Sequence, residues 1–441
     1  TEELGLGGLS GLGSASAWND FDSDGYLDLV FSLKNRKTKN KNVYFFKNNK
    51  GKEFINSSTE LNIIGEPLRS ITWGDYDNDY NPDIAFGTIR APSTPVLYKN
   101  KKNEFVDVSK NTKLEISSGM TSHVVWTDFN KDGFLDLYHV ASRISYLYIN
   151  NKDGTFTDIT YEANLDSEVR GKSAIWFDYN NDGFLDIFLI SYDKNRLYRN
   201  NGDLTFTDVA KEAGLQGDKF WRSVAVCAGD MNNNGLEDIY VVNISSKRNA
   251  LYQNNGDGTF TDITEISGTS DVGDGRTCAW VDINADGYLD LYASNHVTPT
   301  MMFLNDKGKG KFKNVAKESG AIILTDVFSA TWGDYDNDGF LDVFLNGHGG
   351  ITLARNLGNN NKSVTVELVG DGVFTNSLAI GSIARLKTEK KSQMRRVHGG
   401  KGCCEQNMLP VYFGVGKEDL ADLRIEWTLS LIHISEPTRH I

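Results

Sequence analysis

The stretch Trp332–Phe344, WGDYDNDGFLDVF, places a run of acidic residues between two apolar segments. The flanking segments are rich in aromatic and branched residues, which favour β-strands. The acids of the turn stand at alternating positions and close with one further acid, namely Asp334, Asp336, Asp338 and Asp342. A hard cation such as Ca²⁺ takes six to eight oxygen ligands, and a tight acidic turn supplies them at such positions. The stretch therefore predicts a cation-binding turn between two strands.

The same motif occurs seven times along the 441 residues. Its first acid falls at Asp20, Asp75, Asp128, Asp178, Asp230, Asp282 and Asp334. Successive copies are 55, 53, 50, 52, 52 and 52 residues apart. A nearly constant period of this size indicates an array of one supersecondary unit.

The repeated unit consists of four short strand-like segments. In residues 173–210, SAIWFD, FLDIFLIS, KNRLYRNN and LTFTDVA are separated by turn residues, and no helical periodicity is present. Four short strands in each of seven units predict an all-β protein with a seven-bladed β-propeller. A tryptophan precedes the first acid by two positions in six units, at Trp18, Trp73, Trp126, Trp176, Trp280 and Trp332, while the fifth has Ala228. We expect packing between blades from these residues rather than a ligand platform.

Three regions are predicted along the chain. Residues 1–357 form the propeller, 358–430 a small and truncated β domain, and 431–441 a non-native tail that continues no pattern. The seventh unit lacks a good fourth strand. We expect an outer strand at the N-terminus to complete that blade, with most of it upstream of Thr1.

The seven turns follow the pattern D-x-[DN]-x-[DN]-G-x-x-D, in which the seventh position offers a backbone carbonyl. The predicted metal ligands are Asp20, Asp22, Asp24, Tyr26, Asp28, Asp75, Asp77, Asp79, Asp83, Asp128, Asn130, Asp132, Phe134, Asp136, Asp178, Asn180, Asp182, Phe184, Asp186, Asp230, Asn232, Asn234, Asp238, Asp282, Asn284, Asp286, Tyr288, Asp290, Asp334, Asp336, Asp338, Phe340 and Asp342. An EF-hand would need flanking helices and a glutamate at the twelfth position. Simple Asx-rich turns are the alternative.

Charge supports several structural Ca²⁺ ions as the cofactor. The chain has a net charge of −13, and 23 Asp occupy ligand positions, so the remainder carries +10. Without a cation, such close carboxylates repel one another or raise their pKa values. The fifth turn has two carboxylates, Asp230 and Asp238, and is predicted to bind most weakly or not at all. In the second turn Tyr80 replaces the glycine, which predicts backbone strain.

The repeats resemble the FG-GAP/VCBS repeats of integrin α-subunit propellers and of cartilage-acidic-protein-like secreted proteins, over residues 1 to about 355. The resemblance implies Ca²⁺ between the first two strands of each blade, held by the residues above. Near the C-terminus, AIGSIARL, VHGGKG, VYFGVG and LRIEW resemble the ASPIC/UnbV domain, although CCEQ departs from its usual pattern. This match implies architecture more than chemistry.

The opposite face of the ring is predicted to be basic. The connections between second and third strands include LKNRKTKNKN (33–42), GTIRAPSTP (87–95) and SSKRN (245–249). The segments before the first strands add candidate ligand-binding residues near the axis, namely Arg69, His123, Lys172, Arg222 and Arg276. An anionic glycan or an extracellular protein surface is the expected partner, and ordinary solvated lysines and arginines are the alternative. No nucleic-acid motif and no membrane-spanning run is present.

Three functions remain open at this point. The first is an extracellular or cell-surface, calcium-stabilised propeller for adhesion or for binding matrix, glycan or protein. The second is an enzyme of polysaccharide or secondary metabolism, of the lyase or dehydratase type. No catalytic set is predicted, because no triad order, nucleophile elbow or phosphate loop occurs, but His296 and His348 lie on the predicted basic face. The third is a structural module of a larger surface protein.

Overall fold

The computed structural model is almost entirely β-structure. It describes residues 2–9, 11–34, 41–58, 68–88, 95–115, 119–217, 222–296, 298–320, 326–402, 405–428, 434–435 and 439–440. Three short helical turns accompany the strands, at Glu2–Leu6, Ser109–Asn111 and α1 (Thr264–Ser267). Among the described residues, no helix is long and apolar enough to cross a membrane.

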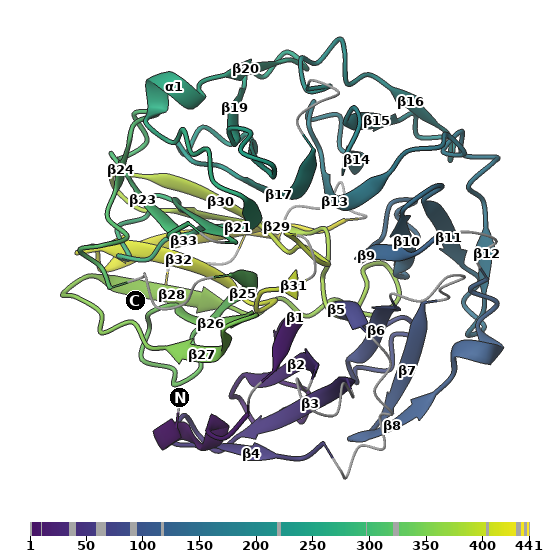
Figure 1. The fold of residues 1–441 in the computed structure, drawn as a ribbon, viewed down its shortest axis with the longest axis horizontal. Helices are drawn as coiled ribbons and strands as arrows, with labels where there is room; N and C mark the ends of the chain where they lie inside the picture. Colours follow the sequence, from purple (N-terminus) through teal and green to yellow (C-terminus); the bar gives the residue numbers. More distant parts are fainter. Residues whose placement is uncertain are drawn as a thin grey trace.

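Seven antiparallel sheets follow one another around a common axis (Figure 1). The strands nearest the axis are β1 (Leu12–Asn19), β5 (Leu68–Gly74), β9 (Thr121–Thr127), β13 (Gly171–Phe177), β17 (Ser223–Gly229), β21 (Gly275–Val281) and β25 (Val327–Gly333). The second strands are β2 (Asp28–Lys34), β6 (Asp83–Thr88), β10 (Asp136–Ala141), β14 (Asp186–Ser191), β18 (Asp238–Asn243), β22 (Asp290–Asn295) and β26 (Asp342–Gly347).

The outer half of each sheet is shorter. The third strands are β3 (Lys41–Asn48), β7 (Val96–Lys101), β11 (Tyr146–Asn150), β15 (Arg196–Asn200), β19 (Ala250–Asn254), β23 (Met301–Asn305) and β27 (Gly350–Ala354). The fourth strands are β4 (Phe54–Asn56), β8 (Glu104–Asp107), β12 (Phe156–Asp158), β16 (Phe206–Asp208), β20 (Phe260–Asp262) and β24 (Phe312–Asn314). This arrangement confirms the predicted all-β propeller.

The core lies between neighbouring blades. Second strands are buried along their whole length, apart from Lys34 at the end of β2, because both faces of each sheet pack against another blade. All six repeated tryptophans are buried, which agrees with the predicted packing role. Trp176, for example, stacks on Phe129 of the preceding blade at a centroid distance of 5.9 Å.

The seventh sheet has three strands, β25, β26 and β27, among the described residues. The turn Glu2–Leu6 lies beside β4 of the first blade. Leu6 is buried in one apolar cluster with Phe54 of the first blade and Phe344 of the seventh. The N-terminal turn thus fills the seam between the two end blades, where the sequence places the end of an outer strand.

The C-terminal residues form two further small sheets. One pairs β28 (Lys362–Val366) with β32 (Val411–Gly416). The other has the order β30–β29–β33–β34, built from β29 (Ile383–Lys387), β30 (Ser392–Arg396), β33 (Leu420–Glu426) and β34 (Ile434–Ser435). In the segment predicted to be a non-native tail, β34 and β35 (Arg439–His440) both pair with β33.

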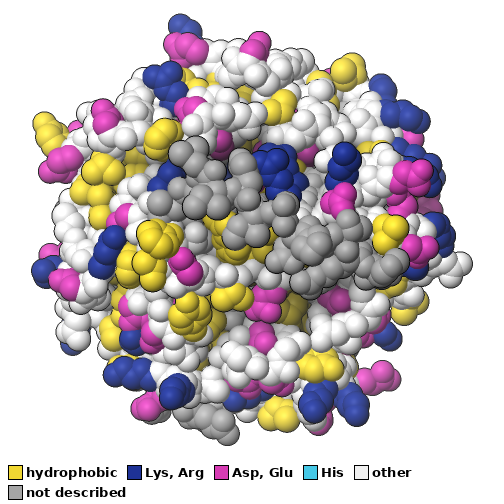
Figure 2. Space-filling model, turned by 180° about the vertical axis from the view of Figure 1, so that it is seen from behind, with side chains coloured by type: hydrophobic (Ala, Val, Ile, Leu, Met, Phe, Trp, Pro, Cys, Tyr) yellow, Lys and Arg dark blue, Asp and Glu magenta, His cyan; other side chains and the backbone are white. Residues whose placement is uncertain are grey.

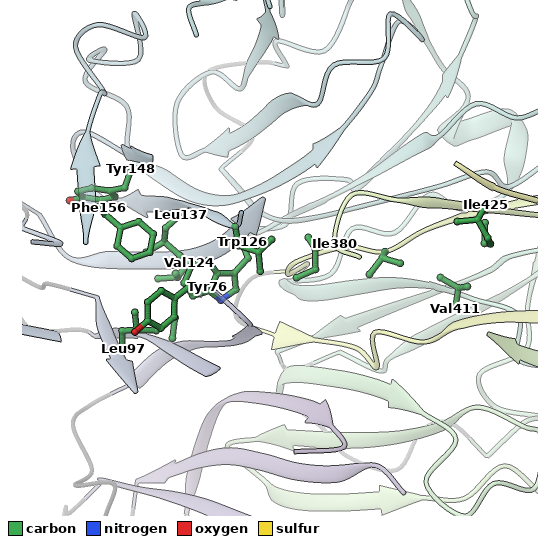
Figure 3. Close-up of a cluster of buried hydrophobic side chains, with 14 of the residues drawn as sticks. Tyr76, Leu97, Val124, Trp126, Leu137, Tyr148, Phe156, Ile380, Val411 and Ile425 are labelled. Atoms are coloured by element: carbon green, nitrogen blue, oxygen red, sulfur yellow. The ribbon is translucent and has the colours of Figure 1, made fainter. Parts of the chain in front are cut away.

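A continuous apolar cluster joins this C-terminal part to the ring. Trp126 and Val124 of β9 belong to the same cluster as Ile380, Val411 and Ile425 (Figure 3). Ile380 lies between the propeller side chains and those of the small sheets in this view. The C-terminal sheets are therefore packed onto the propeller and do not hang from it on a linker.

Candidate metal loops, axial plug and open face

The acidic turns connect the first and second strands of each blade, as predicted. In the turn of the seventh blade, Asp334 accepts hydrogen bonds from the backbone N–H of Asp338 at 3.0 Å and of Gly339 at 2.9 Å. Asp342 accepts the N–H of Asn356 at 2.7 Å through Oδ1. Its Oδ2 atom and Oδ1 of Asp336 are buried without a hydrogen-bond partner. These two oxygens are available to a cation.

Three of the turns bring the first, third and ninth positions together. In each, one carboxylate oxygen per residue lies within 4.8 Å of the others, for Asp20, Asp22 and Asp28, for Asp75, Asp77 and Asp83, and for Asp334, Asp336 and Asp342. Oδ1 of Asp22 and Oδ1 of Asp77 are again buried without partners. Converging, unpartnered oxygens of this kind fit Ca²⁺.

Basic side chains also approach these three turns. Lys47 lies 3.2 Å from Asp22, Lys99 lies 3.1 Å from Asp79, and Arg355 lies 2.7 Å from Asp336. Each basic residue directly precedes the last asparagine of a third strand or its equivalent. This repeated basic residue before an asparagine is a signal that is visible in the sequence. It shows that the crowded acids attract positive charge.

The remaining four turns carry fewer carboxylates. In three of them an asparagine at the third position donates to the fifth-position acid, as Asn180 does to Asp182 at 2.8 Å. Burial raises the pKa of Asp230 in the fifth turn and of Asp282 in the sixth, and the nearby half-buried guanidinium of Arg395 offsets part of this rise. A neighbouring arginine offsets part of the charge that a metal would balance there.

Burial dominates the protonation of the ninth-position acids. Burial raises the pKa of Asp28, Asp186 and Asp342 to about 8, against stabilising hydrogen bonds from backbone N–H groups. The buried Asp83, Asp136, Asp238 and Asp290 are likewise raised well above the usual range. A bound cation favours the ionised form of these acids and removes this penalty.

The seventh position of the turn donates its backbone N–H to the fifth-position acid. The residues concerned are Tyr26, Phe134, Phe184, Tyr288 and Phe340. The predicted role of their carbonyl groups stays a prediction.

The sixth position adopts a left-handed backbone in every turn. Gly339 has φ of 87°, and Tyr80 has φ of 66° in the second turn. A side chain in this region costs conformational energy, which agrees with the predicted strain. The Tyr80 hydroxyl reaches the carbonyl of Gly370 in the C-terminal part at 3.5 Å.

An asparagine at the end of each third strand, or just after it, links neighbouring blades. Asn150 was not predicted to have a role. Its side-chain amide donates to the carbonyl of Tyr76 in the preceding blade at 2.7 Å. Its backbone N–H also donates to Asp136 at 2.9 Å, so one residue fixes the acidic turn of its own blade and the preceding blade together. The equivalent bonds of the other blades start from Asn48, Asn100, Asn200, Asn254, Asn305 and Asn356. Asn48 joins the first blade to Tyr335 of the seventh.

Two stretches of the C-terminal part, residues 399–402 and 405–408, lie at the axis of the ring and are together called the axial plug. Its strand β31 (Glu405–Gln406) pairs in parallel with β1. Backbone bridges join Gly399 to Trp126 of β9 and Gly402 to Val226 of β17. The sequence predicts a small β domain over these residues, and its insertion into the ring was not predicted. Cys403 and Cys404 lie outside the described residues.

The plug satisfies polar groups along the inner strands. Gln406 accepts the N–H of Trp73 at 2.6 Å, and Asn407 accepts that of Trp332 at 2.9 Å. Glu405 is fully buried and accepts Thr277 Oγ1 and the N–H of Ala330, each at 2.5 Å. Lys401 completes this group at 3.0 Å from Glu405. Innermost strands expose one backbone edge to the axis, and the plug supplies their partners.

The C-terminal part also covers the acidic turns. Thr428 contacts Asp128 at 3.4 Å, Gly414 donates its N–H to Asp282 at 3.2 Å, and Tyr412 binds the carbonyl of Gly339 at 2.9 Å. Ser377 binds Asp75. The C-terminal part therefore lies on the face with the acidic turns, and the opposite side of the ring is called the open face.

Among the described residues of the open face, basic, acidic and apolar side chains are interspersed (Figure 2). Arg170 pairs with Asp193 at 2.6 Å and Arg143 with Glu168 at 2.5 Å. A cavity of about 220 Å³, called the axial cavity, lies where the inner strands begin, and Lys34, Arg69, Tyr192, Arg276, Phe328 and His348 are among its lining residues. Residues 35–40 and 89–94 of the predicted basic loops lie outside the described residues.

The predicted ligand residues divide into two groups. Arg69 and Arg276 line the axial cavity, while Lys172 and Arg222 lie over the ring of Tyr192, a lining residue, at 4.0 and 6.0 Å. His123 was assigned wrongly, because it is fully buried between blades and not on the rim. Burial lowers the pKa of His123 to about 3, so it is a neutral core residue.

Family models match both parts of the chain. An FG-GAP-like repeat matches residues 20–86, 141–189, 178–241 and 230–293, and ASPIC and UnbV matches residues 372–431. The chain belongs to the FG-GAP-repeat proteins that carry an ASPIC and UnbV domain. The blades with the acidic turns are thus an FG-GAP propeller, and the axial plug is part of the ASPIC and UnbV domain.

Curated relatives match part of the chain. Cartilage acidic protein 1 of Xenopus tropicalis is 34% identical over 132 residues, and that of Homo sapiens is 30% identical over 131 residues. Each alignment covers 29% of this chain and 20% of the relative, so the chain matches a fifth of their length. Among solved structures, a lectin of Agrocybe aegerita is described as recognising non-reducing terminal N-acetylglucosamine. It is 18% identical to this chain with a TM-score of 0.47, and the match covers 79% of this chain and 89% of the lectin chain. Saccharomyces cerevisiae Sqt1 is 11% identical with a TM-score of 0.47, covering 80% and 100%. Both scores are low, and nothing about function follows from them.

Proposed function

We propose that this FG-GAP propeller is an extracellular, calcium-stabilised binding protein whose axial cavity takes an anionic ligand such as an acidic glycan. The observation that carries the proposal is the lining of the axial cavity, where Arg69 and Arg276 stand beside the aromatic rings of Tyr192 and Phe328. Guanidinium groups recognise carboxylate or sulfate oxygens, and aromatic faces accept the apolar face of a sugar ring.

The cations and rings of the axial cavity are held in place by contacts with one another. The guanidinium of Arg276 lies 4.8 Å from the centre of the Phe328 ring and 3.6 Å from Asp274. Such contacts restrict the side chain before a ligand arrives and so reduce the entropy lost on binding. An anion in the cavity meets at least two positive groups, while the acids of the blade turns lie at the other end of the inner strands.

Calcium has a structural role in this proposal. The residues that would hold it are the acids of the seven blade turns, and the ASPIC and UnbV domain covers several of these turns. A bound Ca²⁺ would supply positive charge to the first-, third- and ninth-position oxygens. It would thereby link the inner hairpin of a blade to the third-strand asparagine that binds the ninth-position acid.

The ligand proposal is tested by titrating alginate and heparin oligosaccharides into the protein, with calorimetry at low and at physiological salt. We expect Arg276→Gln to weaken binding at least tenfold, because a charge-assisted contact is lost. Arg170→Gln is the matched control, since Arg170 lies on the same face, is exposed and is paired outside the axial cavity. Equal affinities of the Arg276→Gln variant and the parent for every oligosaccharide that binds would refute the assignment of the cavity. No binding of any acidic oligosaccharide would refute the ligand class.

An enzyme of the lyase type is the second candidate. The observation that favours it is the convergence of Arg276, His348 and the carboxylate of Asp326 beside one cavity. A lyase acting on a uronate would use a general base to remove a proton and a cation to bind the carboxylate, and these groups could supply both. Incubation with acidic polysaccharides, followed by the ultraviolet absorbance of unsaturated products, separates the candidates, because a binding protein leaves the polymer intact.

A further inference from the structure

In blades three to seven, the same backbone hydrogen bond occurs at the open face. The residue after the second strand donates its N–H to the carbonyl of the residue before the first strand. These pairs are Ser142 with Met120, Tyr192 with Arg170, Ile244 with Arg222, His296 with Asp274, and His348 with Asp326. The donors are 50 or 52 residues apart, so they are equivalent in the repeat.

The last two blades place histidine at this donor position. His296 and His348 therefore leave adjacent blades at equivalent points, and the acceptor residue of the seventh blade, Asp326, lies between them. Nδ1 of His296 contacts Oδ1 of Asp326, and Nδ1 of His348 lies 2.6 Å from Oδ2. The two imidazole rings are 6.2 Å apart and nearly perpendicular, at 85°.

Asp326 is held in an unusual backbone conformation. Its φ is 61°, in the left-handed region, while its carbonyl accepts the N–H of His348 at 3.0 Å. Backbone strain of this kind costs free energy and is concentrated at functional sites. The side chain of Asp326 is 15% exposed, whereas those of His296 and His348 are 34% and 38% exposed. The three residues thus form a partly enclosed group with an opening to solvent.

We propose that His296, Asp326 and His348 form a binding site for a divalent first-row transition ion such as Zn²⁺, separate from the calcium turns. One ligand atom from each residue lies within 4.8 Å of the others, and this is the one such group among the described residues that contains histidine. Imidazole nitrogen is a poor ligand for Ca²⁺ but a good one for zinc, cobalt and nickel. The donor sets of the two faces are therefore chemically distinct.

The site has open coordination positions beside the axial cavity. Three protein ligands leave at least one position of a tetrahedral ion for water or for an external ligand. His348 itself lines the axial cavity and packs on Phe328 at a ring distance of 4.4 Å, and the guanidinium of Arg276 lies 4.8 Å from the centre of the same ring. An ion held here would add positive charge to a cavity already lined by two arginines.

The test is a calorimetric titration of the whole chain with Zn²⁺ in excess Ca²⁺, which is added to saturate the proposed calcium turns. We expect one tight zinc site that is absent or at least tenfold weaker in His348→Gln and in Asp326→Asn. Asp274→Asn is the matched control, because Asp274 lies on the same face and contributes only its backbone to His296. This variant should bind zinc as the parent does.

A titration with Co²⁺ identifies the ligands independently. Tetrahedral or five-coordinate cobalt with two imidazoles gives intense visible absorption, which should be lost in His296→Gln. Circular dichroism on each variant establishes that it is folded before it is compared. Zinc binding of equal strength in the parent and all three site variants would overturn the proposal, and so would absence of a calcium-resistant zinc site in the parent. In either case Asp326 only accepts hydrogen bonds from two histidines. The outcome is independent of glycan binding, since no glycan is present.

Discussion

Two buried histidines show how single residues set the response of this propeller to acid. His139 lies 2.6 Å from Thr121 through Nε2, and its Nδ1 is buried without a partner. Burial lowers the pKa of both His139 and His123 to about 3, from 6.5 in the unfolded chain. Their neutral forms are compatible with the core, but a proton on either ring has no acceptor.

We predict that acid destabilises the protein through these residues. Because the folded pKa is depressed, stability is intact above pH 6.5 and falls as pH decreases from 6.5 towards 3, by up to about 1.4 kcal/mol per pH unit for each histidine. The variant His139→Gln does not titrate there and should lose less stability between pH 7 and pH 4 than the parent. Melting temperatures across this range check the difference, and parallel curves for the two proteins would show that His139 is not responsible.

At the scale of the element, the acidic hairpin is the unit that calcium is expected to stabilise. In the seventh blade, Asp336 contributes an unpartnered Oδ1 atom beside Asp334 and Asp342. The same residues repel one another without a cation, so the hairpin is least stable when it is empty and ionised.

We predict that Asp336→Asn weakens calcium-dependent stabilisation. A site saturated at a hundred times its dissociation constant contributes about 2.7 kcal/mol, and most of this share should disappear in the variant. Scanning calorimetry with Ca²⁺ and with EDTA measures the loss. Asp306→Asn, an exposed acid outside the turns, is the control. A parent melting temperature that EDTA does not change would contradict the calcium role altogether.

The sequence predicts the elements well because their signals are local and repeated. Asp334 binds N–H groups four and five residues away, and a tight turn of this kind needs only its own residues. Seven copies then identify the blade and its strand order. His123 was predicted to lie before the first strand of its blade, but it lies within β9. Its burial depends on contacts with the neighbouring blade, such as Ser173, which no local pattern reveals.

At the scale of the whole molecule, the axial plug ties the ASPIC and UnbV domain to all seven blades. Glu405 and Lys401 are buried together at its centre, with Glu405 also binding the sixth and seventh inner strands. Breaking a buried ion pair leaves one charge without compensation, which is strongly destabilising.

We predict that Glu405→Ala destabilises the entire chain by about 3–5 kcal/mol. The double variant Lys401→Met with Glu405→Met should lose clearly less, because no isolated charge remains. Urea unfolding followed by tryptophan fluorescence reports the propeller directly, since its tryptophans lie at the blade interfaces. Loss of under 1 kcal/mol in Glu405→Ala would mean that the plug does not support the ring.

The amino-acid sequence by itself determined the propeller, the number of blades and the acidic turns, because each rests on contacts within a few residues that recur every 50 to 55 positions. The tertiary structure alone decided where the C-terminal domain lies and which side chains meet at the axis. Gln406 and Trp73 bind across 333 residues, and His296, Asp326 and His348 meet only because two blades are packed side by side. Such contacts depend on how the complete blades and the C-terminal domain pack together, and residue spacing along the sequence does not predict them.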